Sequence, residues 1–270
     1  MVEIRGLLAC SALALGLSGD ADAKTWPQPA LGETDPDDIQ VLFTFDDGPK
    51  PDTTPAILDI LAEHKIHAVF FLVGKQVVSR HEQVPAILDR IVAEGHIVAN
   101  HTMWHSDLCK ATEEDAVVEL DLGRAVIEQA LGMQLSWFRA PYGARCDQLE
   151  AMLAERELTH FHWDLDPQEW KHGSVARTVK DVTRALARAT GRNVLLMHDI
   201  KLVTVVALPK ILAWIDEENA RRAKERRPQI KILQAPALAA EQLPQDLLAW
   251  LTDVVGEAWA LPAAVASVLP

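Results

Sequence analysis

Two adjacent carboxylates, Asp46 and Asp47, stand at the end of the apolar segment 41–45. A turn at Gly48 and Pro49 follows them at once. Capping such a turn would require one carboxylate, and two neighbouring negative charges repel each other, so the pair indicates a further role. Because the chain is turning, both side chains can line one pocket in different directions. One can then bind a metal while the other stays free as a general base.

Two histidines, His101 and His105, are four residues apart. In a helical turn this spacing places both imidazoles on one side, within reach of one cation. The HExxH motif of zinc proteases is excluded, because Thr102 stands where that motif needs glutamate. A third ligand must come from elsewhere, and a carboxylate after the first strand is well placed. Two histidines and one carboxylate leave metal positions open for water and substrate.

Polar clusters follow five of the segments that we expect to be strands. They are DD at 46–47, NHTMWH at 100–105, RAPYG at 139–143, DLDPQEW at 164–170 and MHD at 197–199. In parallel α/β proteins the carboxyl ends of the strands converge on one face, which carries the chemistry. One such cluster alone would be interpreted as structural, but five exceed what capping and turn formation require.

The elements that must position these clusters alternate along the chain. Apolar strands are expected at 41–45, 67–73, 96–99, 136–139, 158–163, 193–197 and 229–233, and helices at 54–65, 82–94, 113–131, 147–157, 176–189 and 204–226. This alternation predicts a parallel sheet with outer helices. Seven strands suit a barrel with one unit missing, and an open doubly wound sheet is the competing architecture. No GxGxxG follows the first strand, which removes the usual reason to prefer a dinucleotide fold.

The composition narrows the classes of protein. The chain has 270 residues, 49% of them hydrophobic, and a formal net charge of −13. This length allows one large domain or two small ones with a sizeable core. The acidic balance argues against a nucleic-acid-binding protein, which would carry a basic face. We assume a monomer.

The amino-terminal segment predicts export. Residues 1–23 have the plan of a signal peptide, with Arg5 before an apolar stretch and small residues at the cleavage site. We therefore expect a periplasmic, cell-wall-associated or secreted protein. Lipid anchoring at Cys10 is disfavoured, because most of the apolar run follows this residue.

Three further segments follow the signal. Residues 24–40 predict an extended lead-in that is rich in proline and acid, residues 41–235 the α/β domain, and residues 236–270 a helical extension that packs on it. No segment after the signal is long and apolar enough to predict a transmembrane helix.

The motifs TFDDGP, HTMWH, RAPYG, WDLDPQEW and LLMH occur in the order and spacing of a known family. The sequence resembles the polysaccharide deacetylases (carbohydrate esterase family four, with a nodulation-protein-type deacetylase domain) over about residues 40–235. The resemblance implies a distorted (β/α)7 barrel. It also implies metal-dependent removal of acetyl groups, commonly from N-acetylglucosamine polymers.

The resemblance carries roles to single residues. It implies three metal ligands, which are Asp47, His101 and His105. It implies four catalytic groups, which are Asp46 as general base, Arg139 as the residue that holds it, His198 as general acid and Asp166 as the carboxylate that orients His198. We expect Asp166 to raise the pKa of His198.

The substrate pocket is also implied by the resemblance. The backbone N–H of Tyr142 matches the oxyanion donor, Pro141 belongs to the same motif, and Trp170 and Leu196 match apolar wall positions. One departure is that Glu169 stands where the family usually has aspartate before the tryptophan. We expect it to change the far wall of the pocket and to spare the catalytic groups.

Cys109 and Cys146 follow the HTMWH and RAPYG motifs and would remain after removal of the signal. Both loops should meet at the same face of the domain. We therefore expect a disulfide that ties the predicted metal loop to the oxyanion loop.

Several alternatives remain open. Zn²⁺, Co²⁺ and Ni²⁺ all suit the ligand set, with Zn²⁺ preferred. The polymer can be peptidoglycan, chitin, poly-N-acetylglucosamine or, with O-deacetylation, acetylxylan. A non-catalytic glycan-binding protein of the same fold is disfavoured because base, ligands and acid are all present. The paired histidines argue against a metal-free cyclic amidohydrolase, and the βα pattern argues against an iron oxygenase.

Overall fold

The structure is a computed structural model that describes residues 39–241. The predicted signal peptide and Cys10 lie outside the described residues, as do most of the lead-in and of the carboxyl-terminal extension. Residues 39 and 40 belong to the first strand, and residues 236–241 belong to a helix that starts at Ala235. Within the described part of the chain, no helix has the length and apolar character needed to cross a membrane.

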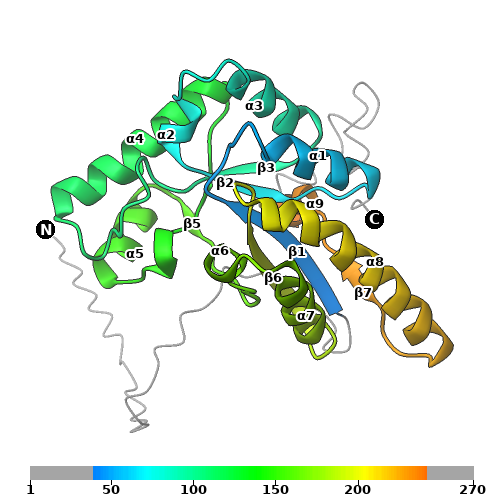
Figure 1. The fold of residues 1–270 in the computed structure, drawn as a ribbon. Coiled ribbons are helices and arrows are strands. Elements are labelled where there is room, and N and C mark those ends of the chain that lie inside the picture. Colours follow the sequence, from blue (N-terminus) through cyan, green and yellow to red (C-terminus); the bar gives the residue numbers. More distant parts are fainter. Residues whose placement is uncertain (1–38, 242–270) are drawn as a thin grey trace, which may run out of the picture.

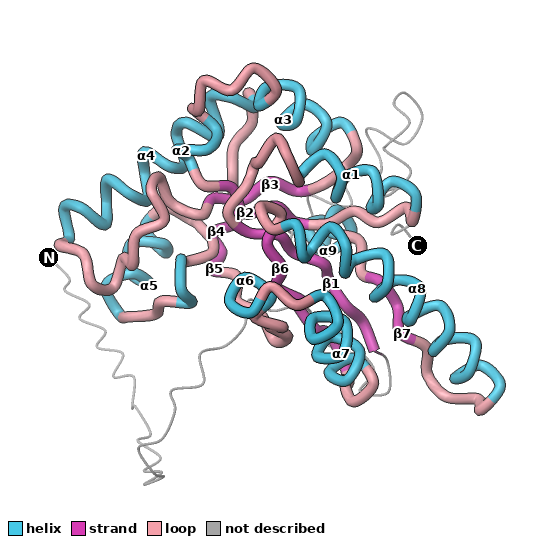
Figure 2. The backbone as a smooth tube through the Cα atoms, viewed as in Figure 1, coloured by secondary structure: helices cyan, strands magenta, loops and turns pink. Residues whose placement is uncertain are grey.

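Seven parallel strands of the described residues form one curled sheet (Figures 1 and 2). They are β1 (Ile39–Asp46), β2 (Val69–Leu72), β3 (Ile97–Asn100), β4 (Trp137–Phe138), β5 (Thr159–His160), β6 (Gly191–His198) and β7 (Ile230–Ile232). The strand order is β5-β4-β3-β2-β1-β6. The strand β7 pairs with the first three residues of β1, on the same edge of β1 that pairs with β2 at its last three residues. In this linear order β6 returns to the far side of β1, as in a doubly wound sheet, but the segment after β5 also pairs with β6, which closes the sheet on itself. The expected distorted barrel is confirmed, as a half-barrel whose ends meet at the bridge between Leu165 and Leu195.

The outer helices follow the strands as the sequence predicts. They are α1 (Thr54–Glu63), α3 (Val84–Ala93), α4 (Glu113–Leu131), α5 (Asp147–Glu155), α7 (Val175–Leu186), α8 (Leu202–Lys224) and α9 (Ala235–Glu241). Three short pieces were not expected, namely α2 (Gly74–Val77), the 3₁₀ turn η1 (Pro141–Gly143) and α6 (Glu169–His172). Each of these short pieces follows the carboxyl end of a strand, where it shapes the functional face.

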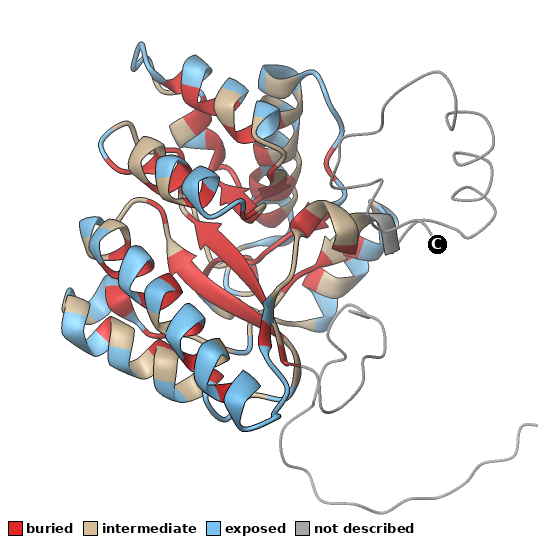
Figure 3. Cartoon of the chain, turned by 90° about the vertical axis from the view of Figure 1, so that its right-hand side faces the viewer, coloured by how far each residue is buried: buried red, intermediate tan, exposed pale blue. Residues whose placement is uncertain are grey.

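The buried core has two layers, because strand side chains alternate between faces. Phe43 and Phe45 point outward from β1 and belong to the layer between the sheet and the helices. Leu42 points inward and packs with Phe71 and Phe161 inside the half-barrel. The strands are buried on both faces, while the outer sides of the helices are exposed (Figure 3). Strands of a parallel sheet therefore read as continuous apolar runs, as β1 does.

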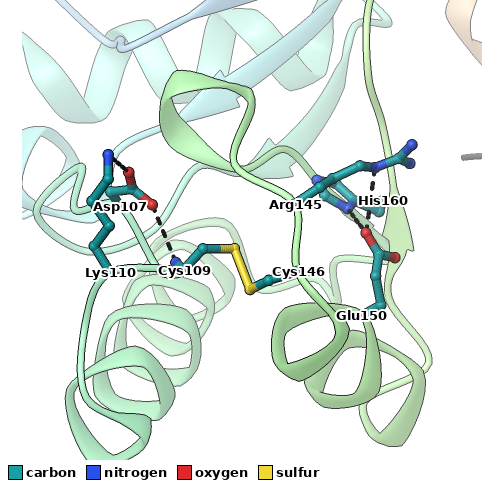
Figure 4. The surroundings of a disulfide bond; sticks show 7 residues. All are labelled: Asp107, Cys109, Lys110, Arg145, Cys146, Glu150 and His160. Atoms are coloured by element: carbon teal, nitrogen blue, oxygen red, sulfur yellow. Dashed lines mark hydrogen bonds and ion pairs between the residues drawn. A yellow bond between two sulfur atoms is a disulfide. The ribbon is translucent and has the colours of Figure 1, made fainter. Parts of the chain in front are cut away.

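A disulfide joins Cys109 and Cys146, as predicted, with their Cα atoms 5.9 Å apart. Figure 4 shows it between two polar clusters. On one side Asp107 accepts a hydrogen bond from the Cys109 N–H at 3.2 Å. On the other side Glu150 contacts His160 at 2.8 Å. The bond links the loop after β3 to the loop after η1, which are the two loops that the sequence predicts to meet.

Candidate metal centre and active site

Asp46 is the last residue of β1 and lies on the inward-facing side of this strand. Alternation places Leu42, Thr44 and Asp46 toward the barrel interior. There the Arg139 guanidinium donates from Nη1 to Thr44 Oγ1 at 2.8 Å and to Asp46 Oδ1 at 2.7 Å. Arg139 is fully buried, and its guanidinium also lies 4.0 Å from the centre of the Phe71 ring. The buried Asp46 carboxylate is thus fixed on one side by a charged partner, as predicted.

The second carboxylate leaves the strand in a different direction. Asp47 has a φ of 80°, which turns its side chain away from the Asp46 path and toward the two histidines. Its Oδ1 lies 3.1 Å from His105 Nε2 and 3.6 Å from His101 Nε2. One ligand atom from each of Asp47, His101 and His105 lies within 4.8 Å of the others. The three predicted ligands are therefore brought together from β1 and from the loop after β3.

The hydrogen bonds of this group fit a cation. His101 Nδ1 donates to the backbone carbonyl of Arg139 at 2.7 Å, which leaves the lone pair on Nε2 facing the carboxylates. Burial lowers the pKa of His101, and this effect outweighs the negative charges of Asp46 and Asp47, which raise it. The ring is therefore neutral and able to bind a metal. Asp47 Oδ1 is buried and accepts no hydrogen bond from the described residues. A lone pair and a carboxylate oxygen that face each other in this way are the donor set of a metal site.

His198, at the end of β6, is held by a carboxylate other than the predicted one. Its Nδ1 donates to Glu169 Oε1 at 2.8 Å, and its backbone N–H donates to the same oxygen at 2.8 Å. Asp166 instead accepts from the N–H of Gln168 at 2.7 Å. The predicted orienting role of Asp166 is therefore wrong, as is the expectation that Glu169 spares the catalytic groups. The reason is local: Gln168 adopts φ 53°, so the chain turns after Asp166 and α6 begins with Glu169 fully buried beneath β6.

Glu169 also sets the charge of the imidazole. Burial alone would lower the pKa of His198. The hydrogen bond to Glu169 and the negative charges of Glu169, Asp46 and Asp47 outweigh that effect and raise the pKa to about 8. His198 is therefore protonated at neutral pH, which a general acid requires.

The RAPYG motif, which is predicted to supply the oxyanion donor, lies at the exposed edge of the site. Tyr142 lies in η1 with φ 62°, and 70% of its surface is exposed. Its ring centre is 4.7 Å from that of His105, and its hydroxyl is 3.2 Å from His105 Nδ1. Pro141 is buried and does not line the pocket, whereas Ala140 does.

One hollow of about 240 Å³ collects these groups at the carboxyl ends of the strands. Its predicted lining residues are Asp46, Asp47, His101, His105, Tyr142, Asp166, Trp170, Leu196 and His198. Trp163 and Lys201 also line it and were not predicted as site residues. A motif at the end of the expected strand 158–163 could have pointed to Trp163, but no sequence signal distinguishes Lys201 from other surface lysines.

Two neighbouring hollows share walls with the central one. Asp47, His105 and Tyr142 also border a pocket that contains Trp104 and Lys75. Trp170 and Lys201, which line the central hollow, also border a shallow pocket lined by Leu202 and Val206. Each neighbouring hollow thus shares lining residues with the central one, and Trp104, Tyr142 and Trp170 are exposed aromatic residues among them. We refer to the three hollows together as the groove.

Residues 33–161 match the polysaccharide deacetylase family. A chitooligosaccharide deacetylase of Sinorhizobium fredii is 38% identical over 160 residues, which cover 59% of this chain and 71% of that protein. The chain belongs to the polysaccharide deacetylase family. It is a hydrolase that acts on carbon–nitrogen bonds.

Other members agree in sequence and in fold. A peptidoglycan-N-acetylglucosamine deacetylase of Bacillus cereus is 31% identical over 186 residues, covering 67% of this deacetylase and 65% of the relative. The solved structure of the peptidoglycan deacetylase PdaC from Bacillus subtilis matches with a TM-score of 0.63 at 26% identity. That match covers 84% of this chain and 100% of the PdaC chain in the structure.

Proposed function

We propose that this polysaccharide deacetylase is an exported, zinc-dependent enzyme that removes acetyl groups from N-acetylglucosamine units of a glycan. The observation that carries the proposal is the separation of two roles between neighbouring residues. Asp47 joins His101 and His105, while Asp46 stays apart from them, bound to Arg139. His198 lines the same hollow.

The first step requires a base beside the attacking water. A divalent cation held by Asp47, His101 and His105 would polarise the amide carbonyl and acidify the attacking water. Arg139 occupies Oδ1 of Asp46, and Oδ2 lies 3.7 Å from His101 Nε2, on the side of the metal ligands. Asp46 Oδ2 is thus the oxygen that takes the proton of the water.

The second step requires an acid for the leaving group. The amine is a poor leaving group until it is protonated, and His198, charged at neutral pH, supplies that proton. The backbone N–H of Tyr142 donates to the oxyanion of the tetrahedral intermediate. A donor of this class contributes about 3–4 kcal/mol to the transition state.

The choice of zinc rests on the ligands. Two imidazole nitrogens and one carboxylate oxygen match open catalytic zinc sites, in which a fourth position is left for water. Co²⁺ and Ni²⁺ also suit these ligands, and zinc is the ion that we prefer among the three.

The groove supports an extended glycan as substrate. Trp104 lines a hollow that shares Asp47 and His105 with the central one, and Trp170 lines the central hollow, with 47% and 48% of their surfaces exposed. Flat apolar rings at the surface favour ligands that bury a face against them, as sugar rings do. The named activities of the relatives, on chitooligosaccharides and peptidoglycan, favour N-deacetylation over the alternative, O-deacetylation of acetylxylan.

Export is supported by the disulfide. Such bonds persist in oxidising compartments and are rare in the cytosol. The bond between Cys109 and Cys146, together with the signal pattern of residues 1–23, favours a periplasmic, cell-wall or secreted location.

An acetate-release panel tests the proposal. Purified mature protein is incubated with chitin oligomers, poly-N-acetylglucosamine, peptidoglycan and acetylxylan, alongside the Asp46→Ala and His101→Ala variants. We expect acetate from at least one N-acetylglucosamine polymer, no turnover by either variant, and bound zinc in Asp46→Ala but not in His101→Ala. Release from acetylxylan alone, or from no substrate, would refute the proposal, and turnover by Asp46→Ala would refute the base assignment.

A further inference from the structure

A buried carboxylate outside the catalytic group lies against the loop that carries both histidine ligands. Glu119 is on α4, and 5% of its surface is exposed. Its Oε2 accepts a hydrogen bond from the Trp104 N–H at 2.8 Å, and its Oε1 accepts one from the Ser106 hydroxyl. Its backbone carbonyl accepts from the Met103 N–H at 2.9 Å. One glutamate thus contacts three residues of the loop 101–106.

The loop has a conformation that needs such support. Thr102 and His105 both adopt φ 67°, in the left-handed region that disfavours residues with a Cβ. Each such residue costs about 1–3 kcal/mol and persists only where its surroundings fix it. Because His105 is itself a proposed ligand, the direction of its imidazole depends on this strained backbone.

The face of α4 around Glu119 is shaped to meet the loop. The Leu120 carbonyl accepts from Asn100 Nδ2 at 3.0 Å. Gly123 lies so close to the loop that a Cβ there would come within 2.5 Å of the Thr102 carbonyl carbon. The helix therefore approaches the loop closely enough for the short Glu119 contacts to form.

We propose that Glu119 is a positioning residue that holds this loop so that His101 and His105 meet Asp47 at one cation. Within residues 39–241 Glu119 forms no ion pair, so the hydrogen bonds of the loop are what balance its burial. The inference rests on the metal site proposed above. Groups that orient metal ligands in this way typically change metal affinity about 10–100-fold when they are removed.

Zinc affinity is the measurement that tests the proposal. The Kd for zinc is determined by competition with a chelator for wild type, Glu119→Met and Glu119→Gln, with Glu128→Met as the matched control. Glu128 lies on the same helix and accepts a backbone hydrogen bond too, from Leu135 N–H at 2.9 Å, but it does not contact the metal loop.

Glu119→Met should weaken zinc binding by about tenfold or more. Glu119→Gln keeps one carbonyl oxygen for the Trp104 N–H and should fall between wild type and Glu119→Met, while Glu128→Met should stay within about twofold of wild type. Urea unfolding of the metal-free proteins gives the structural cost of each change. Loss of stability in Glu119→Met with an unchanged zinc Kd would overturn the proposal.

A second variant covers the case in which Glu119→Met does not fold. Ser106→Ala removes one donor from the same carboxylate, and unchanged zinc affinity there would also overturn the proposal. Because the readout is metal affinity, this failure is distinct from failure of the proposed function, which would appear as absence of acetate release by the wild-type protein.

Discussion

Asp46 and Asp47 are adjacent, yet their side chains have different surroundings. Asp46 follows the alternation of β1 into the barrel and is bound by Arg139. Asp47 leaves the strand with φ 80° and faces the two histidines. The type and position of these residues predict that the pair divides two roles. Their environments depend on contacts across the fold, and only the motif resemblance could assign which carboxylate takes which role.

The carboxylate that orients the acid shows where residue-level prediction failed. Asp166 and Glu169 are three residues apart in one motif, and either could reach His198 on the basis of spacing alone. The outcome was decided by the left-handed turn at Gln168, which buries Glu169 under β6. Such a φ value has no reliable signature in a single glutamine.

The Glu169→Gln substitution tests the partner of His198. The pKa of His198 is raised to about 8, so the protonated acid is present below that pH and is lost as the pH rises through it. Removing the negative charge of Glu169 should lower this pKa by about one unit, and the alkaline limb of the kcat profile should move down equally. The measurement is acetate release between pH 6 and pH 9.

Asp166→Asn is the control for that profile. Asp166 lines the same hollow but its carboxylate caps Gln168 rather than contacting His198. The alkaline limb of the kcat profile should therefore move less in Asp166→Asn than in Glu169→Gln. The opposite order of shifts would contradict the assignment.

At the scale of elements, the sequence predicts the convergence of the five polar clusters correctly. The carboxyl ends of parallel strands lie on one face of the sheet, so the strands alone place each cluster there, independently of the loop conformations. The long helices were predicted because their apolar period spans several turns; α4, for example, is found at the predicted residues 113–131. The pieces α2 and α6 have four residues each, which is too short to show a period.

The link between the two loops gives a stability prediction. Cys109 and Cys146 are separated by 37 positions, and closing a loop of that length in the unfolded chain contributes roughly 3–4 kcal/mol. The Cys109→Ser/Cys146→Ser double variant should lose about that much free energy of unfolding. Urea denaturation measures it, and reduced wild-type protein should match the variant. Equal stability of oxidised and reduced wild type would contradict the prediction.

The groove gives a prediction on substrate length. Trp104→Ala removes the exposed ring from the pocket beside Tyr142 but keeps the backbone N–H that Glu119 binds. We expect kcat/KM to fall about tenfold for long N-acetylglucosamine oligomers and to change little for short ones, as loss of one aromatic contact predicts. Met133→Ala, at a 40% exposed site after α4, is the control. An equal loss at all chain lengths would count against the groove.

The stability of the whole molecule includes a pH-dependent contribution from His96, a buried histidine away from the active site. Burial, with smaller effects of His67 and Arg90, lowers the pKa of His96 to about 4, and its Nδ1 accepts a hydrogen bond from the Ala68 N–H at 3.0 Å. His96 is therefore protonated near pH 6.5 in the unfolded chain but only near pH 4 in the folded protein. The contribution of neutral His96 to the free energy of unfolding is therefore fully present above pH 6.5. It is lost as the pH falls from about 6.5 toward about 4.

The His96→Gln variant isolates this term. Between pH 7 and pH 5 the wild type should lose about 2 kcal/mol more free energy of unfolding than the variant, because only the wild type takes up the proton on unfolding. Urea titrations at both pH values measure the difference. Parallel losses in the two proteins would show that His96 does not contribute.

The proposed deacetylation depends on a cation held by Asp47, His101 and His105, and metal removal tests this dependence most directly. Acetate release from N-acetylglucosamine oligomers is measured for purified protein before chelation, after chelation and after return of one equivalent of zinc. We predict that chelation abolishes release and that zinc restores it. Undiminished release by protein stripped of divalent metals would contradict a metal-dependent mechanism.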